Sequence, residues 1–158
     1  MSRRISTKKR FPQKDLKYDN LLVSLLINRI LKAGKKRLAR RIVYKAFNLI
    51  EFRTNQNPIF IFEKAIRNIS PRVQLKAKRV GGATHQVPTL LTKFRSTIIA
   101  VCWLIAFSRK RSGKGMHLKL ANELIEAAKG LGNSIRKKEE THKMAEANKA
   151  FAKFKKFK

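Results

Sequence analysis

Residues 73–88 read VQLKAKRVGGATHQVP, and here the hydrophobic period changes from that of a helix to that of a strand, which repeats every two residues. Apolar and polar side chains alternate from Val73 to Lys78, which is typical of a β-strand with one exposed face. Gly81-Gly82 follows, and glycine adopts the positive φ of a tight turn without steric cost. A second strand is predicted over residues 84–87, and Pro88 is expected to end it. The stretch therefore predicts a β-hairpin.

On both sides of the hairpin the hydrophobic period is helical. Capping and stop residues predict helices at about 20–34, 35–50, 57–70, 93–109, 120–128 and 133–149. The predicted fold class is mainly α, a six-helix single domain over residues 1–158 with the hairpin between helices three and four. A basic N-terminal extension (1–18) and a basic aromatic tail (150–158) complete it. Because two strands alone are marginal in water, we expect the hairpin arm to project and to be ordered by its partner.

The fourth predicted helix contains the most apolar segment of the chain, Ile98 to Phe107, and the single tryptophan, Trp103. We therefore expect it to be the central core helix. The lone Cys102 cannot form an internal disulfide and is expected to be a small core residue in a reducing compartment. In the tail, Phe151 either stacks on bases or packs as a last helical turn, and both interpretations remain open.

The composition is strongly basic. The 158 residues include 39 Lys+Arg and 9 Asp+Glu, which gives a formal net charge of +30. So much charge in one small domain costs self-repulsion, so a polyanion must supply the countercharge. A membrane span is excluded because the longest apolar run has ten residues, whereas a spanning helix needs about 20. Nucleic acid remains as the partner.

The cations are also segregated from the acids. No acidic residue lies between Glu63 and Glu123, a stretch with 13 Lys+Arg. An ordinary solvated surface mixes both signs, so we interpret this stretch as a contact surface. The triplet Lys35-Lys36-Arg37 opens a helix and opposes its macrodipole, so helix stability does not explain it.

The sequence contains no catalytic constellation. His85, His117 and His142 share no metal-ligand spacing, and Gly113-Lys114-Gly115 lacks the remainder of a phosphate-binding loop. Nine acids, most of them in the C-terminal third, make paired-carboxylate catalysis improbable. We expect no catalytic residue, no metal and no cofactor, and the chain is not expected to be an enzyme.

Two long strings carry a family resemblance. Residues 78–88, KRVGGATHQVP, and residues 136–151, RKKEETHKMAEANKAF, closely resemble small ribosomal subunit protein seven of the bacterial and plastid type. Shorter matches fall in the same order along essentially the whole chain: Arg3-Arg4, Gly34-Lys35-Lys36, and residues 106–111 and 120–124. Residues 28–32 and 135–142 look more like plastid than free-living bacterial members.

The resemblance implies a structural constituent of the small ribosomal subunit that acts in translation. It implies a primary binder of the 3′ major domain of small-subunit rRNA, which nucleates head assembly. It places the hairpin near exit-site tRNA and the mRNA path, with small-subunit protein eleven and other head proteins as neighbours and no membrane. The plastid (chloroplast) stroma is the implied location, with the bacterial cytoplasm as the alternative. An organelle-encoded protein needs no import signal, although residues 2–7, SRRIST, superficially resemble one.

The expected contacts form two sets. Cations of the N-terminal extension, the start of the second helix, the hairpin and the fourth helix with its loop are expected to bind rRNA: Arg3, Arg4, Lys8, Lys9, Arg10, Lys35, Lys36, Arg37, Lys76, Lys78, Arg95, Arg109, Lys110, Arg111 and Lys114. Hairpin residues expected near tRNA and mRNA are Arg79, Gly81, Gly82, Thr84, His85 and Gln86.

Two other protein classes are alternatives. A DNA-binding helical protein would need a clear recognition helix, which the sequence lacks. An RNA-modifying enzyme would need the catalytic groups whose absence is noted above.

Overall fold

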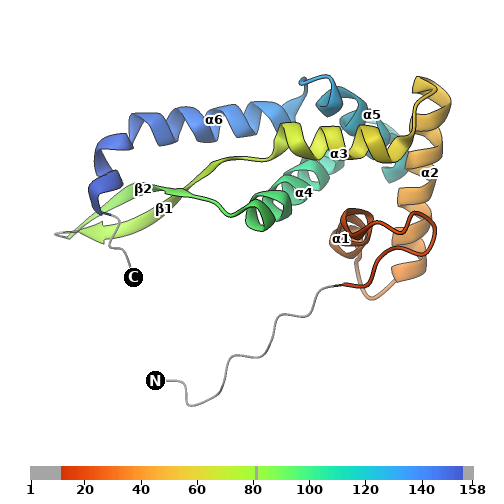
Figure 1. Cartoon of the computed structure of the whole chain (residues 1–158), viewed down its shortest axis with the longest axis horizontal. Helices are drawn as coiled ribbons and strands as arrows, with labels where there is room; N and C mark the ends of the chain where they lie inside the picture. Colours follow the sequence, from red (N-terminus) through yellow and green to blue (C-terminus); the bar gives the residue numbers. More distant parts are fainter. Residues whose placement is uncertain (1–11, 81, 155–158) are drawn as a thin grey trace, which may run out of the picture.

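The computed structural model describes residues 12–80 and 82–154, and over this part of the chain the predicted fold class is confirmed (Figure 1). The described chain has six α-helices and one antiparallel hairpin, which lies between the third and fourth helices in chain order. In chain order the elements are α1 (Leu21–Ile30), α2 (Lys36–Thr54), α3 (Pro58–Ile69), β1 (Val73–Val80), β2 (Ala83–Leu90), α4 (Lys93–Lys110), α5 (Met116–Ala128), α6 (Asn133–Ala147) and the 3₁₀-helix η1 (Lys149–Phe154).

Local sequence explains where several helices begin and end. The side chain of Asn20 accepts a hydrogen bond from the Leu22 amide at 2.8 Å, which caps α1. Asn57 caps α3 in the same way, with Pro58 in the first turn, where its missing N–H costs nothing. Asn55 ends α2 in the left-handed region with φ 51°.

The centre of the hydrophobic core is α5. Leu120, Ala121, Leu124 and Ala127 are fully buried, and α5 packs against α2, α3, α4 and α6. α4 also belongs to the core, because it buries Ala100, Val101, Leu104 and Ile105 and packs against α1, α3, α5 and α6. Trp103, however, is only partly buried at the edge of this core. The apolar content of a helix does not reveal which of its side chains face the core, because tertiary packing decides that.

The hairpin has the predicted two-residue turn but longer strands. β1 and β2 pair from Val73 opposite Leu90 to Val80 opposite Ala83, and Gly82 has φ 87°. Pro88 does not end β2 as expected, because it lies inside the strand opposite Leu75. Each strand of a two-stranded ribbon has one unpaired edge, and a proline whose nitrogen faces that edge removes no ladder hydrogen bond.

The hairpin projects from the bundle as expected, but other elements of the chain pack along it (Figure 1). α6 lies alongside it and η1 contacts β2 (Figure 1). Val87 is fully buried, and the ring of His85 lies against the ring of Phe151 with centroids 4.7 Å apart. The packing interpretation of Phe151 is therefore the one observed, although the contact is with the hairpin rather than with the helical bundle.

Polar contacts fix the base of the hairpin to the helices. The Ser96 hydroxyl donates to the Pro71 carbonyl at 2.6 Å. Just before the hairpin, Lys138 Nζ on α6 donates to the Asn68 carbonyl in the last turn of α3 at 2.6 Å. The backbone N–H of Arg72 donates to Nε2 of His142 at 3.1 Å. His142 must be neutral at this nitrogen to accept, so the contact depends on its protonation.

Acidification is expected to weaken the contact between His142 and the base of the hairpin. Burial, followed by the charges of Lys138 and Arg72, holds the pKa of His142 below its usual 6.5. The unfolded chain therefore binds this proton more readily than the folded one. The stabilising contribution is present above about pH 6.5 and is lost as the pH falls through the lowered pKa.

Loss of one hydrogen bond of about 1 kcal/mol lowers the Tm by about 2–4 °C in a chain of this size. Thermal melts between about pH 8 and pH 5 measure this, with His142→Gln as a control that cannot titrate. The wild-type Tm is expected to fall more steeply than that of the variant, and parallel curves would contradict the prediction.

Part of the expected N-terminal extension packs on the bundle. The buried carboxylate of Asp15 accepts a hydrogen bond from the Tyr44 hydroxyl at 2.8 Å. Burial, and then this bond, raises the pKa of Tyr44 to about 12. The ring of Tyr18 packs edge-on against Tyr44 and Phe47 at centroid distances of 5.6 and 5.3 Å. Residues 12–20 therefore cover one side of α2.

Candidate nucleic-acid interface

The first turns of the described helices lack acids, and that of α2 exposes cations instead. None of α1 to α6 has an acidic residue in its first turn, although an acid there interacts favourably with the macrodipole. Lys35 is the N-cap of α2 and makes no side-chain capping bond, and Lys36 and Arg37 follow; all three are exposed. Cations at the start of α2 lower the stability of the helix, but they present positive charge to an external anion.

The fold brings the start of α2 beside the end of α4. A hollow between them has an apolar floor and a basic rim, and its lining residues are Ile30, Lys32, Ala33, Lys35, Leu38, Ala39, Ile42, Arg109 and Met116. Two sequence-distant predicted contacts, Lys35 and Arg109, therefore share one rim. We define the bundle-end surface as Lys32, Lys35, Lys36, Arg37, Arg109 and Lys110, all of which are exposed.

The sequence prediction missed a continuation of this surface along α2. A second hollow is lined by Arg37, Arg40, Arg41, Tyr44, Lys45 and Asn48. The Nε atom of Arg40 is buried there without a hydrogen-bond partner among the described residues. Arg37, Arg41 and Lys45 recur every four residues, and this spacing was the available signal that one helix face carries them.

The predicted hairpin residues form a separate surface. Lys76, Arg79, Thr84 and Gln86 are exposed on the two strands, while Lys78 and His85 are half-buried and lie opposite each other in register. Figure 1 shows the hairpin on the side of the molecule opposite α2. The hairpin and bundle-end contacts are therefore not one patch.

The remaining predicted residues have varied positions. Arg95 is exposed in the first turn of α4, close in sequence to the base of the hairpin, and Lys114 is exposed in the loop before α5. Five predicted cations and one predicted glycine lie outside the described residues: Arg3, Arg4, Lys8, Lys9, Arg10 and Gly81.

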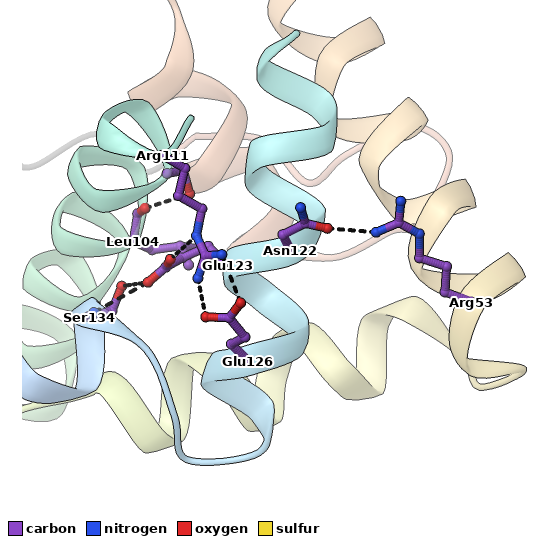
Figure 2. A network of polar contacts seen from close by, with 8 residues as sticks. Arg53, Leu104, Arg111, Asn122, Glu123, Glu126 and Ser134 are labelled. Carbon is purple, nitrogen blue, oxygen red and sulfur yellow. Dashed lines mark hydrogen bonds and ion pairs between the residues drawn. The ribbon is translucent and has the colours of Figure 1, made fainter. Parts of the chain in front are cut away.

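Arg111 differs from its basic neighbours because two carboxylates hold its side chain (Figure 2). Nε donates to Glu123 at 2.5 Å, and the two terminal nitrogens donate to the two oxygens of Glu126. The hydrogen bond with Glu126 raises the pKa of Arg111 further and lowers the pKa of Glu126 below its usual value. A phosphate contact by Arg111 would compete with these two ion pairs.

Other kinds of site receive no support from the geometry. Within residues 12–80 and 82–154, no three His, Cys, Asp or Glu side chains are placed to hold a metal ion. Likewise, no described helix combines the length and apolarity needed to cross a membrane.

Comparison with known proteins gives a match along nearly the whole chain. The family model described as ribosomal protein S7p/S5e matches residues 1–149. The small ribosomal subunit protein uS7c of Trieres chinensis is 56% identical over 144 residues, which cover 91% of each chain. The uS7 proteins of Synechococcus elongatus and Acaryochloris marina are 53% and 55% identical over 152 residues, which cover 96% of this chain and 97% of each relative.

Proposed function

This chain belongs to the ribosomal protein S7p/S5e family, and from that premise we propose how it acts in the small ribosomal subunit. It is a structural ribosomal protein of translation rather than an enzyme. We propose that it binds the 3′ major domain of small-subunit rRNA as a primary binder and nucleates assembly of the subunit head. The observation that carries this proposal is the bundle-end surface, where the start of α2 and the end of α4 expose cations and no acid.

The arrangement of the cations favours recognition by shape. A folded rRNA junction offers phosphates in several directions, and its deep major groove is closed to side chains. A rigid bundle with cations at two helix ends and along α2 matches such a target better than a single reading helix would. Phosphate contacts release counterions, so the affinity should depend steeply on salt.

The proposed rRNA contacts are the described predicted cations apart from Arg111, together with those found on α2. They are Lys35, Lys36, Arg37, Arg40, Arg41, Lys45, Lys76, Lys78, Arg95, Arg109, Lys110 and Lys114. Arg111 is left out because its ion pairs with Glu123 and Glu126 already use its charge. The N-terminal cations Arg3, Arg4, Lys8, Lys9 and Arg10 stay predictions.

The direct test is binding of the whole chain to a 3′ major-domain rRNA transcript and to duplex DNA of equal length over a range of salt. We expect tighter binding to the transcript and a log K against log salt slope of about −0.7 to −0.9 for each phosphate contact. Equal binding to both polymers at every salt concentration would contradict specific rRNA recognition. Co-sedimentation with small subunits checks the same proposal in the assembled particle.

For the hairpin we propose a position near exit-site tRNA and the mRNA path. Arg79, Thr84 and Gln86 are exposed near the tip and carry hydrogen-bonding groups, and Gly82 lets the backbone approach RNA closely. These side chains can be removed without disturbing the packing of His85 on Phe151.

Replacement of Arg79, Thr84 and Gln86 by alanine is expected to separate assembly from function. Head assembly should be normal, because primary binding comes from the bundle, whereas retention of exit-site tRNA or maintenance of the reading frame should change. Reconstituted subunits carrying the triple variant measure both. If they fail to assemble, the hairpin is an rRNA anchor and the proposed separation is wrong.

We also propose small-subunit protein eleven and other head proteins as neighbours. Glu139, Glu140 and Glu146 are exposed on α6, and carboxylates suit contact with a basic protein better than contact with phosphate. We propose the plastid stroma as the location, supported by the similarity to a diatom uS7c, with the bacterial cytoplasm as the alternative because cyanobacterial relatives are almost as similar.

A further inference from the structure

A polar network around the buried Glu123 joins α4, α5 and α6 at a single point (Figure 2). Arg111 is the C-cap of α4, and it contacts Glu123 and Glu126 on α5. Glu123 has a fully buried side chain, and its second oxygen accepts hydrogen bonds from both the backbone N–H and the hydroxyl of Ser134, in the first turn of α6. One carboxylate therefore connects the end of α4 with the start of α6.

The network is complete, which is what makes a buried carboxylate tolerable. Each oxygen of Glu123 has a partner, and Glu126 meets the guanidinium with both of its oxygens. Gly132 lies close against the pair: a Cβ atom there would be 3.3 Å from Oε2 of Glu126 and 3.5 Å from Oε1 of Glu123. The chain between α5 and α6 thus closes over the two carboxylates.

Arg111 lies next to three other predicted rRNA contacts in the chain. Arg109 and Lys110 directly precede it at the exposed end of α4, and Lys114 follows in the short loop to α5. We propose that Glu123 and Glu126 are positioning residues for rRNA binding: they hold Arg111, and through it they keep Arg109, Lys110 and Lys114 aligned with the cations of α2. This inference rests on the proposed function, because it assumes that these cations bind rRNA.

Simple electrostatics and a positioning role of Glu126 predict opposite changes in rRNA affinity when its charge is removed. Glu126 has a side chain that is 42% exposed, so its negative charge can be felt by a nearby polyanion. Removing that charge raises the net charge of the chain above +30 and by itself should tighten rRNA binding. If Glu126 positions the loop, removing it weakens binding instead.

The experiment compares Glu126→Gln with Glu51→Gln, which removes an exposed acid on α2 outside the network. We expect Glu126→Gln to weaken binding to the 3′ major-domain transcript about tenfold, whereas Glu51→Gln leaves it unchanged or tighter. Gly132→Ala changes no charge, but it places a Cβ atom 3.3 Å from Oε2 of Glu126 at a backbone position with φ 99°, so it should act in the same direction as Glu126→Gln. Circular dichroism at the binding temperature checks that each variant is folded.

A second readout needs no RNA. Trypsin cleavage after Lys110 and Lys114 should be faster in Glu126→Gln than in wild type, because the substitution frees the loop without adding a cleavage site. Unchanged cleavage, or unchanged or tighter binding by folded Glu126→Gln, would overturn the inference. Arg109→Ala separates failure of the proposed rRNA interface from failure of the positioning inference. If Arg109→Ala binds the transcript as tightly as wild type, Arg109 is not an rRNA contact. The trypsin measurement then still decides whether Glu123 and Glu126 position the loop.

Discussion

Replacement of Lys35, Lys36 and Arg37 together by glutamine should flatten the log K against log salt slope for rRNA binding by about 2 to 3. Each lost phosphate contact removes about 0.7–0.9 from this slope, and all three side chains are exposed at the start of α2. A slope change of this size corresponds to about a hundredfold weaker binding at about 0.15 M salt. Titrations of the 3′ major-domain transcript at several salt concentrations measure it.

The same triple variant should be at least as stable as wild type, because these cations oppose the α2 macrodipole. A matched control neutralises three exposed cations that belong neither to the bundle-end surface nor to the hairpin: Lys64, Arg136 and Lys143. If the control flattens the salt slope equally, binding depends on total charge rather than on the bundle-end surface. An unchanged slope with a lower Tm would make the triplet a structural feature.

Leu124→Ala is expected to destabilise the free protein by about 2–5 kcal/mol. Leu124 is fully buried in the middle of α5, the helix that contacts α2, α3, α4 and α6, so the neighbouring elements are poorly able to close the cavity. Domains of this size have total stabilities of about 5–15 kcal/mol, so the loss is a large fraction. Urea unfolding followed by circular dichroism measures it.

Trp103→Ala serves as the comparison for Leu124→Ala. Tryptophan is larger than leucine, so side-chain volume alone predicts the greater loss for Trp103. The structure predicts the reverse, because Trp103 is only partly buried at the edge of the core. A greater loss for Trp103→Ala would mean that α4 rather than α5 is the energetic centre of the bundle.

Sequence reasoning found the elements of this fold because their signals are local. Asn20 and Asn57 cap helices through amides two residues away, and the glycine turn requires only its own backbone geometry. The central position of α5 and the packing of the hairpin along α6 were not found. Both depend on contacts between segments distant in sequence, such as that between His85 and Phe151.

The predicted rRNA contacts differ in the same way: some follow from local sequence, and others depend on contacts between distant segments. Lys35, Lys36 and Arg37 were predicted from a conflict within their own helix, and they are exposed. Arg109 and Arg111 have equivalent sequence contexts, yet only Arg111 is ion-paired within the described chain. Its partners lie 12 and 15 residues further along, on another helix, and their approach depends on how α4 and α5 cross.

The packing of the hairpin on α6 and η1 has a consequence for the order in which the chain folds during its own synthesis. Translation delivers β1 and β2 well before His142 and Phe151, which fix the base and the far part of the hairpin. Until those residues emerge, the ribbon has only its own cross-strand bonds and is marginal by itself. Pulse-labelling hydrogen exchange on stalled nascent chains should therefore find the hairpin amides protected only after about residue 151 has left the exit tunnel.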